Sequence, residues 1–301
     1  MLTLLILAGA ALLAAVALVS GNNLSACVGT VIGAGILRRR TGIILGVAGY
    51  ISGLILQGHY LADAATKLLP VTSSTIITEA LLVTVIVFMI GHVLKAPLSL
   101  TMSLVGLITG ISVANHQAID VHYFDRIAIM WIAAPLIAIC SAYVATKLLN
   151  RSTPRNVWHR VSVYKILLIV VSFLAAYVLG ANTVALMVSV AGFNTTNIFI
   201  ATIGIIAGCF LLSSRELKRV GHELFSLRYS NALVTLANSV VLVEIATLFG
   251  LPLSNTQTLS AGLFGSGLSY RQRCISMKPF AIIVVGWVLA PLASFIVGYF
   301  I

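Results

Sequence analysis

Apolar residues fill long stretches of this sequence, and short polar clusters separate them. In the first half the apolar segments cover six ranges: Leu2–Val19, Leu24–Leu37, Thr41–Leu56, Ile76–Leu94, Leu98–Ala114 and Ile127–Leu149. A helix needs roughly 17 to 25 apolar residues to cross a bilayer, and several segments reach that length. A membrane barrel would alternate polar and apolar positions, whereas Leu81–Ile90 is apolar on nearly every face. The pattern predicts an all-α polytopic membrane protein, with the lipid bilayer as its surroundings.

Composition strengthens this prediction, because 60% of the 301 residues are hydrophobic and only 8% are charged. Soluble domains carry about 25% charged residues. The segment Leu2–Val19 has no basic region before it and is longer than the core of a signal peptide, so we expect it to belong to the mature fold. The four cysteines stand far apart without metal-ligand spacing, which predicts no metal site, no cofactor and no disulfide framework: Cys27, Cys140, Cys209 and Cys274.

Three motifs of the first half recur in the second half in the same order. The pairs are Asn22-Asn23 with Asn182-Thr183, Pro97-Leu98-Ser99-Leu100-Thr101 with Pro252-Leu253-Ser254-Asn255-Thr256, and the Trp-x-x-Ala-Pro-Leu segments that begin at Trp131 and Trp287. Their offsets are 160, 155 and 156 residues (182 minus 22, 252 minus 97 and 287 minus 131). The sequence therefore predicts a duplication, with a first repeat over 1–149, a linker over 150–160 and a second repeat over 161–301.

The net charge of +11 follows from basic clusters between the apolar segments. These clusters hold 16 of the 18 Lys and Arg residues: Arg38–Arg40, Lys95, Lys147–Lys165, Arg215–Arg228 and Arg271–Lys278. The positive-inside rule accounts for them, so no nucleic-acid partner is expected. Taking the clusters as cytoplasmic predicts a multi-pass protein of the cytoplasmic (plasma) membrane, with the linker inside and both termini outside.

Equivalent loops of the two repeats carry different charge. The basic turn at Arg38 matches the uncharged Gly192–Asn197, and the nearly neutral His59–Thr78 matches the basic Ser213–Arg228. Equivalent loops on opposite sides require an odd number of crossings in each repeat, which predicts two inverted-topology repeats.

Six segments per repeat is an even number, so one of them must fail to cross. The segment from Leu24 is short, and we expect it to be re-entrant or to pair with a broken first helix, like the short stretch that begins at Val184. The predicted fold therefore has re-entrant or broken helices at its centre.

Polar residues interrupt apolar sequence at Gly21-Asn22-Asn23 and at Gly180–Thr183. Irregular backbone inside a membrane is tolerated where protein or a water-filled cavity covers it. We interpret both interruptions, and the segments after Pro97 and Pro252 in the first turn of a helix, as four polar helix starts. Helix starts favour anions, and starts without basic neighbours suit a small tetrahedral oxyanion. The alternative is that these small residues only pack helices closely.

The paired motifs resemble the two signature copies of the inorganic phosphate transporter family, in which each repeat carries a Gly-Ala-Asn-Asp-type and a Pro-Val-Ser-Thr-Thr-type motif. The resemblance covers essentially the whole chain. It implies a secondary transporter, not an enzyme, that moves inorganic phosphate together with Na⁺ or H⁺. It also implies a substrate held near the middle of the membrane by the motif residues: Asn22, Asn23, Ser99, Thr101, Asn182, Thr183, Ser254, Asn255 and Thr256.

The sequence departs from the family pattern at the two motif carboxylates, where Asn23 and Thr183 stand instead. Leu100 and Asn255 replace the first threonine of the later motif. Without acids the site is less suited to favouring protonated phosphate over sulfate, which only accepts hydrogen bonds near neutral pH. A sulfate permease of the same family, and an uncoupled anion channel, therefore stay open as alternatives.

One acid, Glu244, falls well inside an apolar segment, about two turns before Pro252. An intramembrane carboxylate is costly and indicates function. We hypothesise that Glu244 takes up a proton and couples transport to the proton gradient, with a structural pairing to Asn238 or a neighbouring helix as the alternative. No nucleotide-binding loop indicates a pump, and the sequence leaves open whether the protein forms a homodimer.

Overall fold

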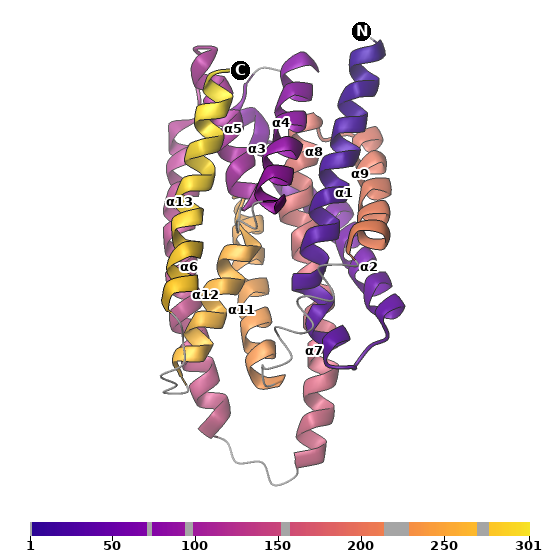
Figure 1. Ribbon diagram of the computed structural model, residues 1–301, viewed down its shortest axis with the longest axis vertical. Helices are drawn as coiled ribbons and strands as arrows, with labels where there is room; N and C mark the ends of the chain where they lie inside the picture. The colour runs from indigo at the N-terminus through magenta and orange to yellow at the C-terminus, as the bar shows by residue number, and fades with distance from the viewer. Residues whose placement is uncertain (1, 71–73, 94–98, 152–156, 214–228, 270–276) are drawn as a thin grey trace.

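The computed structural model describes residues 2–70, 74–93, 99–151, 157–213, 229–269 and 277–301, and this part of the chain contains helices and no strand (Figure 1). Its elements are α1 (Leu2–Gly33), α2 (Arg39–Gln57), η1 (Gly58–Leu61), α3 (Ala64–Leu68), α4 (Ser74–Val93), α5 (Leu100–Ala114), α6 (Val121–Arg151), α7 (Val157–Leu179), η2 (Gly180–Val184), α8 (Ala185–Ala191), α9 (Thr195–Ala207), η3 (Gly208–Leu212), α11 (Tyr229–Leu248), α12 (Asn255–Leu268) and α13 (Met277–Tyr299). Within the described residues, six helices are long and apolar enough to cross a membrane. The prediction of an all-α multi-pass membrane protein is confirmed.

The first helix passes through the Asn22-Asn23 motif without interruption. α1 has 32 residues, which gives a length of about 48 Å at 1.5 Å per residue. The expectation of a break at Gly21 and a separate re-entrant segment from Leu24 is therefore wrong. A Cβ atom on Gly21 would lie 2.6 Å from the carbonyl oxygen of Gly208, so this glycine permits close packing of α1 against the chain after α9. For Gly21, the alternative interpretation that small residues only pack helices closely is therefore correct.

The equivalent position in the second half is irregular but does not start a helix either. Gly180–Val184 forms a π-helical turn, η2, that joins α7 to α8, and the joined segment over 161–191 is one candidate membrane span. The expected short re-entrant stretch from Val184 is therefore also wrong. π turns in helices are frequent at functional sites.

The segments that turn back inside the bundle are α4–α5, the first hairpin, and α11–α12, the second hairpin. Figure 1 shows α4 running inward from the end that holds both termini, and α5 returning to that end. The backbone N–H of Asp120 donates to the carbonyl oxygen of Lys67 at 3.0 Å, so the chain before and after the first hairpin meets at one end. The second hairpin turns back from the opposite end (Figure 1).

Each hairpin packs against a long helix of the other half. α5 packs on α13, and α12 packs on α6. Likewise α1 packs on α9 and α4, while α7 packs on α2 and α11. The pairings of one half thus recur in the other when α1, α2, the first hairpin and α6 are matched with α7, α9, the second hairpin and α13.

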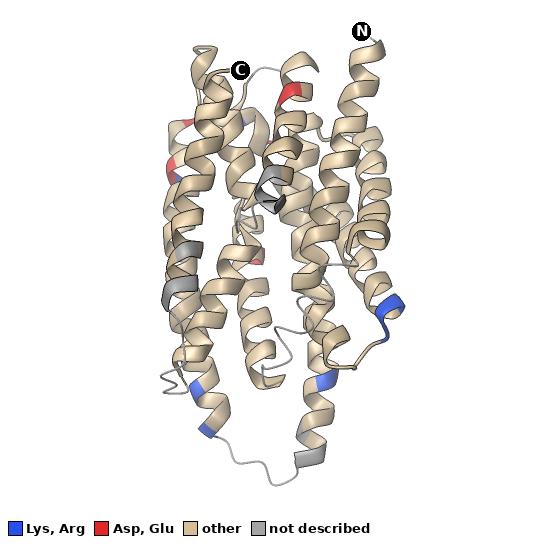
Figure 2. Ribbon diagram, viewed as in Figure 1, with Lys and Arg blue, Asp and Glu red and all other residues tan. Residues whose placement is uncertain are grey.

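Charged side chains of the described residues separate along the bundle (Figure 2). Most Lys and Arg residues lie toward the end where α6 ends and α7 begins, and most acids lie toward the end with the termini. The helix α11 carries one acid, Glu244, within its apolar sequence. The basic stretches at Lys95, Arg215–Arg228 and Arg271–Arg273 lie outside the described residues.

Candidate functional site

The first hairpin and the second hairpin meet near the middle of the bundle at the starts of α5 and α12. Ser99 is the N-cap of α5 and accepts a hydrogen bond from the Met102 N–H at 3.4 Å. Ser254 is the N-cap of α12 and accepts from the Gln257 N–H at 3.3 Å. Serine is favoured at this position because its hydroxyl satisfies an N–H that has no partner within the helix.

Of the four predicted polar helix starts, the structure shows two, at Ser99 and Ser254. The two asparagine motifs do not start helices. Pro252 lies two residues before the cap, and not in the first helical turn as expected. Pro97 lies outside the described residues.

The two helix starts face and touch each other. The Ser99 hydroxyl donates to the Ser254 hydroxyl at 2.8 Å, which joins the two hairpins directly. Each start presents first-turn N–H groups without intrahelical acceptors and about half a positive charge. Two such starts directed at one point favour a negative charge between them.

A small cavity of about 10 Å³ lies between these helix starts. Its lining consists of Asn23, Ser99, Leu100, Thr101, Leu179, Thr183, Ser254, Asn255 and Thr256. Seven of the nine residues predicted from the motifs are in this set, and the other two, Asn22 and Asn182, are not. Sequence reasoning missed Leu100 and Leu179, because an apolar residue within or beside a polar motif carries no signal of its own.

The cavity presents neutral hydrogen-bonding groups. Asn255 is 5% exposed and its side-chain oxygen accepts from Ser239 at 2.8 Å, whereas its Nδ2 has no partner among the described residues. Buried donors are almost always paired, so this amide nitrogen is a donor available to a bound group. No residue in the lining carries a charge.

Hydroxyl groups supply the other contacts around the cavity. The Thr101 and Thr183 hydroxyls lie 3.5 Å apart, and the Ser254 and Thr256 hydroxyls lie 3.0 Å apart. A hydroxyl can turn to donate either to its neighbour or to a bound anion. The η2 turn therefore brings Thr183 to the cavity from α7, opposite Thr101 on α5.

Asn182 serves a different purpose from the one predicted. Its Nδ2 donates to the Thr247 hydroxyl and to the Leu251 carbonyl oxygen, both at 3.0 Å, and its Oδ1 accepts from the Leu253 N–H at 3.0 Å. The side chain is fully buried. Asn182 therefore holds the connection between α11 and α12 and positions the Ser254 cap that follows it.

The long helix α6 supports the same connection from the other side. The indole N–H of Trp131 donates to the Pro252 carbonyl oxygen at 3.0 Å, and Gln257 Nε2 donates to the Trp131 carbonyl oxygen at 2.8 Å. The Tyr123 hydroxyl donates to the Gly250 carbonyl oxygen at 2.6 Å. The connection between α11 and α12, residues 249–254, forms the tip of the second hairpin. Side chains from both halves of the chain therefore fix this hairpin tip.

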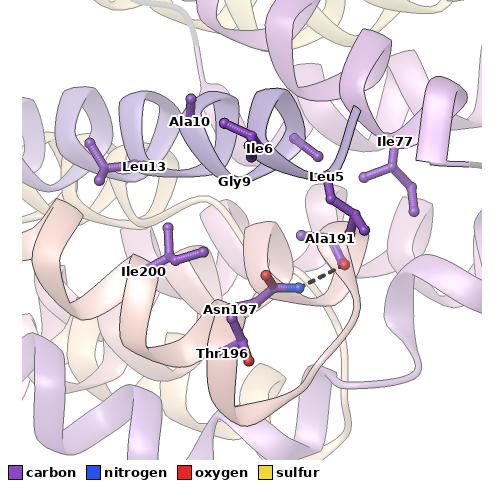
Figure 3. A pocket seen from close by; sticks show the side chains of 11 residues that line it. Leu5, Ile6, Gly9, Ala10, Leu13, Ile77, Ala191, Thr196, Asn197 and Ile200 are labelled. Carbon is purple, nitrogen blue, oxygen red and sulfur yellow. Dashed lines mark hydrogen bonds between the residues drawn. The ribbon is translucent and has the colours of Figure 1, made fainter. Parts of the chain in front are cut away.

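A larger cavity of about 430 Å³ lies along α1 and α9, near the end with the termini (Figure 3). Its lining is mostly apolar, with Leu5, Ile6, Leu13 and Ile200 among its residues. The Asn197 amide at its edge already donates to the carbonyl oxygens of Ala191 and Gly192. No charged side chain of the described residues lines this cavity, and none of the motif residues line it.

Glu244 lies outside the cavity lining, on the same helix as Thr247. Its Oε1 accepts a hydrogen bond from Gln57 Nε2 at 2.8 Å. Asn238, the structural partner considered from sequence, bonds instead to α6, where its Nδ2 donates to the Ala138 carbonyl oxygen and its Oδ1 accepts from Ser141. The partner of Glu244 on a neighbouring helix is thus Gln57, at the end of α2.

Two hairpins that face each other across a polar cavity, within an all-helical membrane bundle, define a membrane transport protein. A family model described as the phosphate transporter family matches residues 19–298. The chain belongs to this family, which confirms the resemblance found in the motifs and the prediction of a transporter and not an enzyme.

Individual relatives span almost the whole chain. A predicted phosphate permease of Methanocaldococcus jannaschii is 25% identical over 287 residues, which cover 94% of this chain and 92% of the relative. The sulfate permease CysP of Bacillus subtilis is 22% identical over 303 residues, which cover 93% of this chain and 82% of the relative. A solved structure titled the sodium-dependent phosphate transporter shares the fold, with a TM-score of 0.83, 16% identity and coverage of 99% of this chain and 98% of the other.

Proposed function

We propose that this protein is a secondary transporter that moves inorganic phosphate across the cytoplasmic membrane together with a cation, H⁺ or Na⁺. The family assignment and the relatives named as phosphate transporters support the substrate. The observation that carries the proposal is the unpaired, buried Nδ2 of Asn255 between two opposed helix starts. That nitrogen and the surrounding hydroxyls form a donor set for a tetrahedral oxyanion.

Transport through this site requires the hairpins to move. A water molecule fits a cavity of roughly 10 to 15 Å³, so the observed 10 Å³ is too small for a tetrahedral oxyanion. Binding would separate the Ser99 and Ser254 hydroxyls and redirect them to the anion. Hairpins that open alternately toward opposite ends would expose the anion first on one side and then on the other.

The orientation in the membrane follows from charge. Because the described basic residues gather at the end where α6 and α7 approach each other (Figure 2), that end would face the cytoplasm under the positive-inside rule. The linker over 150–160 would then be cytoplasmic, and both termini would lie outside.

Sulfate is the second candidate substrate, and a specific observation favours it. No carboxylate lines the cavity, whereas phosphate keeps at least one proton near neutral pH and benefits from an acceptor for it. Sulfate needs donors alone. The relative named as a sulfate permease matches over most of its length.

Uptake into proteoliposomes tests both candidates. Labelled phosphate and labelled sulfate are compared with an imposed proton gradient, an imposed sodium gradient, or neither. Accumulation of one anion under one gradient supports a symporter and identifies its partners, whereas equilibration without accumulation supports a channel. No flux of either anion contradicts the proposal.

A variant of the free donor tests the site itself. Asn255→Ala removes the unpaired amide, and a hydrogen bond to a charged group contributes about 1.5 to 3 kcal/mol. We expect the KM for the transported anion to rise at least tenfold. Asn115→Ala is the matched control, because that side chain bonds to its own helix at Ile111, away from the cavity. Equal KM values in the Asn255→Ala variant and the unchanged protein contradict this site.

A further inference from the structure

Glu244 and Gln57 form a half-buried acid–amide pair between α11 and α2. The Gln57 Nε2 atom donates to Glu244 Oε1 at 2.8 Å, and the two residues are 187 positions apart. A carboxylate at membrane depth is costly and faces the interior of the bundle or a polar partner. The pair therefore joins two otherwise distant segments at one polar point.

Two of the four polar side-chain atoms of this pair are left without a partner in the described structure. Glu244 Oε2 and Gln57 Oε1 are both buried and, within the described part of the chain, neither has a hydrogen-bond partner. Both atoms are acceptors when the acid is ionised. A buried acceptor that is left unpaired destabilises the structure.

One proton satisfies both atoms at once. A protonated carboxyl group opposite a primary amide forms a ring of two hydrogen bonds, in which the amide N–H donates to one carboxyl oxygen and the acid O–H donates to the amide oxygen. The first of these bonds is present, and a proton on Glu244 would supply the donor for the second. The observed arrangement is therefore complementary to the neutral acid.

The pair is connected to the candidate site through one helical turn. Thr247 follows Glu244 by three residues on α11, and its hydroxyl accepts from Asn182. Asn182 in turn holds Leu251 and Leu253, which lead to the Ser254 cap. A movement of this turn of α11 therefore reaches the hairpin tip directly.

The titratable surroundings of Glu244 are limited in the described residues packed against α11. From α7, Tyr177 interacts electrostatically with Glu244 and with Tyr60 of η1. α12 and η2 contain no titratable side chain, and α6 meets α11 through Ala138 and Ser141. η1, which also packs against α11, carries His59, and the centroid of its ring lies 4.3 Å from that of the Tyr60 ring.

We propose that Glu244 and Gln57 form the proton-carrying site of the transporter, which couples anion movement to the proton gradient. Protonation closes the acid–amide ring and holds α11 against α2, and loss of the proton reopens it and frees the turn that leads to the hairpin tip. This inference rests on the proposed anion transport and assigns its coupling cation and coupling residue. Gln57 is the positioning residue of the pair.

The test separates anion exchange from gradient-driven accumulation in proteoliposomes that contain a trapped pH-sensitive dye. The unchanged protein should accumulate anion under an inward proton gradient, with acidification of the lumen. In Glu244→Gln the neutral side chain imitates the protonated acid, so exchange at equal anion concentrations should persist. Its accumulation ratio should fall to one, without acidification. Glu79→Gln is the matched control, because Glu79 is an exposed acid on α4.

A reversed pair decides whether the ring itself matters. The double variant Gln57→Glu with Glu244→Gln restores one acid and one amide with the positions exchanged, and it should regain proton-driven accumulation. Accumulation by Glu244→Gln equal to that of the unchanged protein, or accumulation driven by sodium alone, overturns the inference. So does a double variant that exchanges anion without accumulating it. Absence of exchange in the unchanged protein contradicts the proposed function instead.

Discussion

The two asparagine motifs stand at matching places in the two halves of the sequence but are used differently. In the first half, α1 continues through Asn22 and Asn23, and Asn23 lines the cavity. In the second half the chain winds into the η2 turn, which directs Thr183 to the cavity and Asn182 to the hairpin connection. Asn22 is half-buried, whereas Asn182 is fully buried. The second positions of the two motifs, Asn23 and Thr183, thus both line the cavity, whereas the first positions differ, because Asn182 braces the hairpin connection and Asn22 stays half-buried.

The largest expected effect distinguishes these roles directly. Asn182→Ala leaves the Thr247 hydroxyl, the Leu251 carbonyl oxygen and the Leu253 N–H without their partner. Each buried polar group left unpaired costs about 1 to 3 kcal/mol, so we expect a clear drop in melting temperature in detergent and loss of anion uptake. Asn22→Ala, at the half-buried equivalent, should lower the melting temperature much less. Equal drops would remove the contrast between the two motifs.

A smaller effect is expected at the glycines that precede the two motifs. A Cβ atom on Gly180 would overlap the Tyr50 carbonyl oxygen, and one on Gly21 would lie 2.6 Å from the Gly208 carbonyl oxygen. Overpacking costs typically about 1 to 3 kcal/mol. Gly180→Ala should therefore destabilise the protein more than Gly21→Ala, as measured by thermal unfolding. A larger loss in Gly21→Ala would contradict the closer approach of η2 to α2 at Gly180.

The smallest effect on stability is expected at the two serine caps, and it tests whether the two hairpins stabilise each other. Ser99→Ala and Ser254→Ala each remove a cap worth about 0.5 to 2 kcal/mol, and both remove their mutual hydrogen bond. A double-mutant cycle on thermal stability should give a coupling energy of about 0.5 to 1.5 kcal/mol. Strict additivity of the two single losses would show that the hydroxyls do not stabilise each other.

The sequence predicts the helical class and most of the cavity lining, because apolar length and paired polar motifs report these directly. It did not identify the re-entrant segments. α4 and α11 are as apolar as helices that cross, so composition does not distinguish a helix that turns back. The Gly-Asn interruption at residue 21 was misread because glycine also permits close helix packing, and only the neighbouring backbone at Gly208 decides between the two meanings. The contacts of Asn182 likewise depend on residues about 70 positions away.

The exchange of packing partners between the halves bears on how the chain is assembled. The first hairpin rests through α5 on α13, the last helix of the chain, whereas the second hairpin rests through α12 on α6. During synthesis the partner of the second hairpin is already present when that hairpin emerges. The first hairpin must wait for the final helix to be inserted, because chains are made from the N-terminus onward. The candidate site is therefore completed only at the end of synthesis. Until then the first hairpin lacks its packing partner α13 and is the part of the site most exposed to non-native contacts.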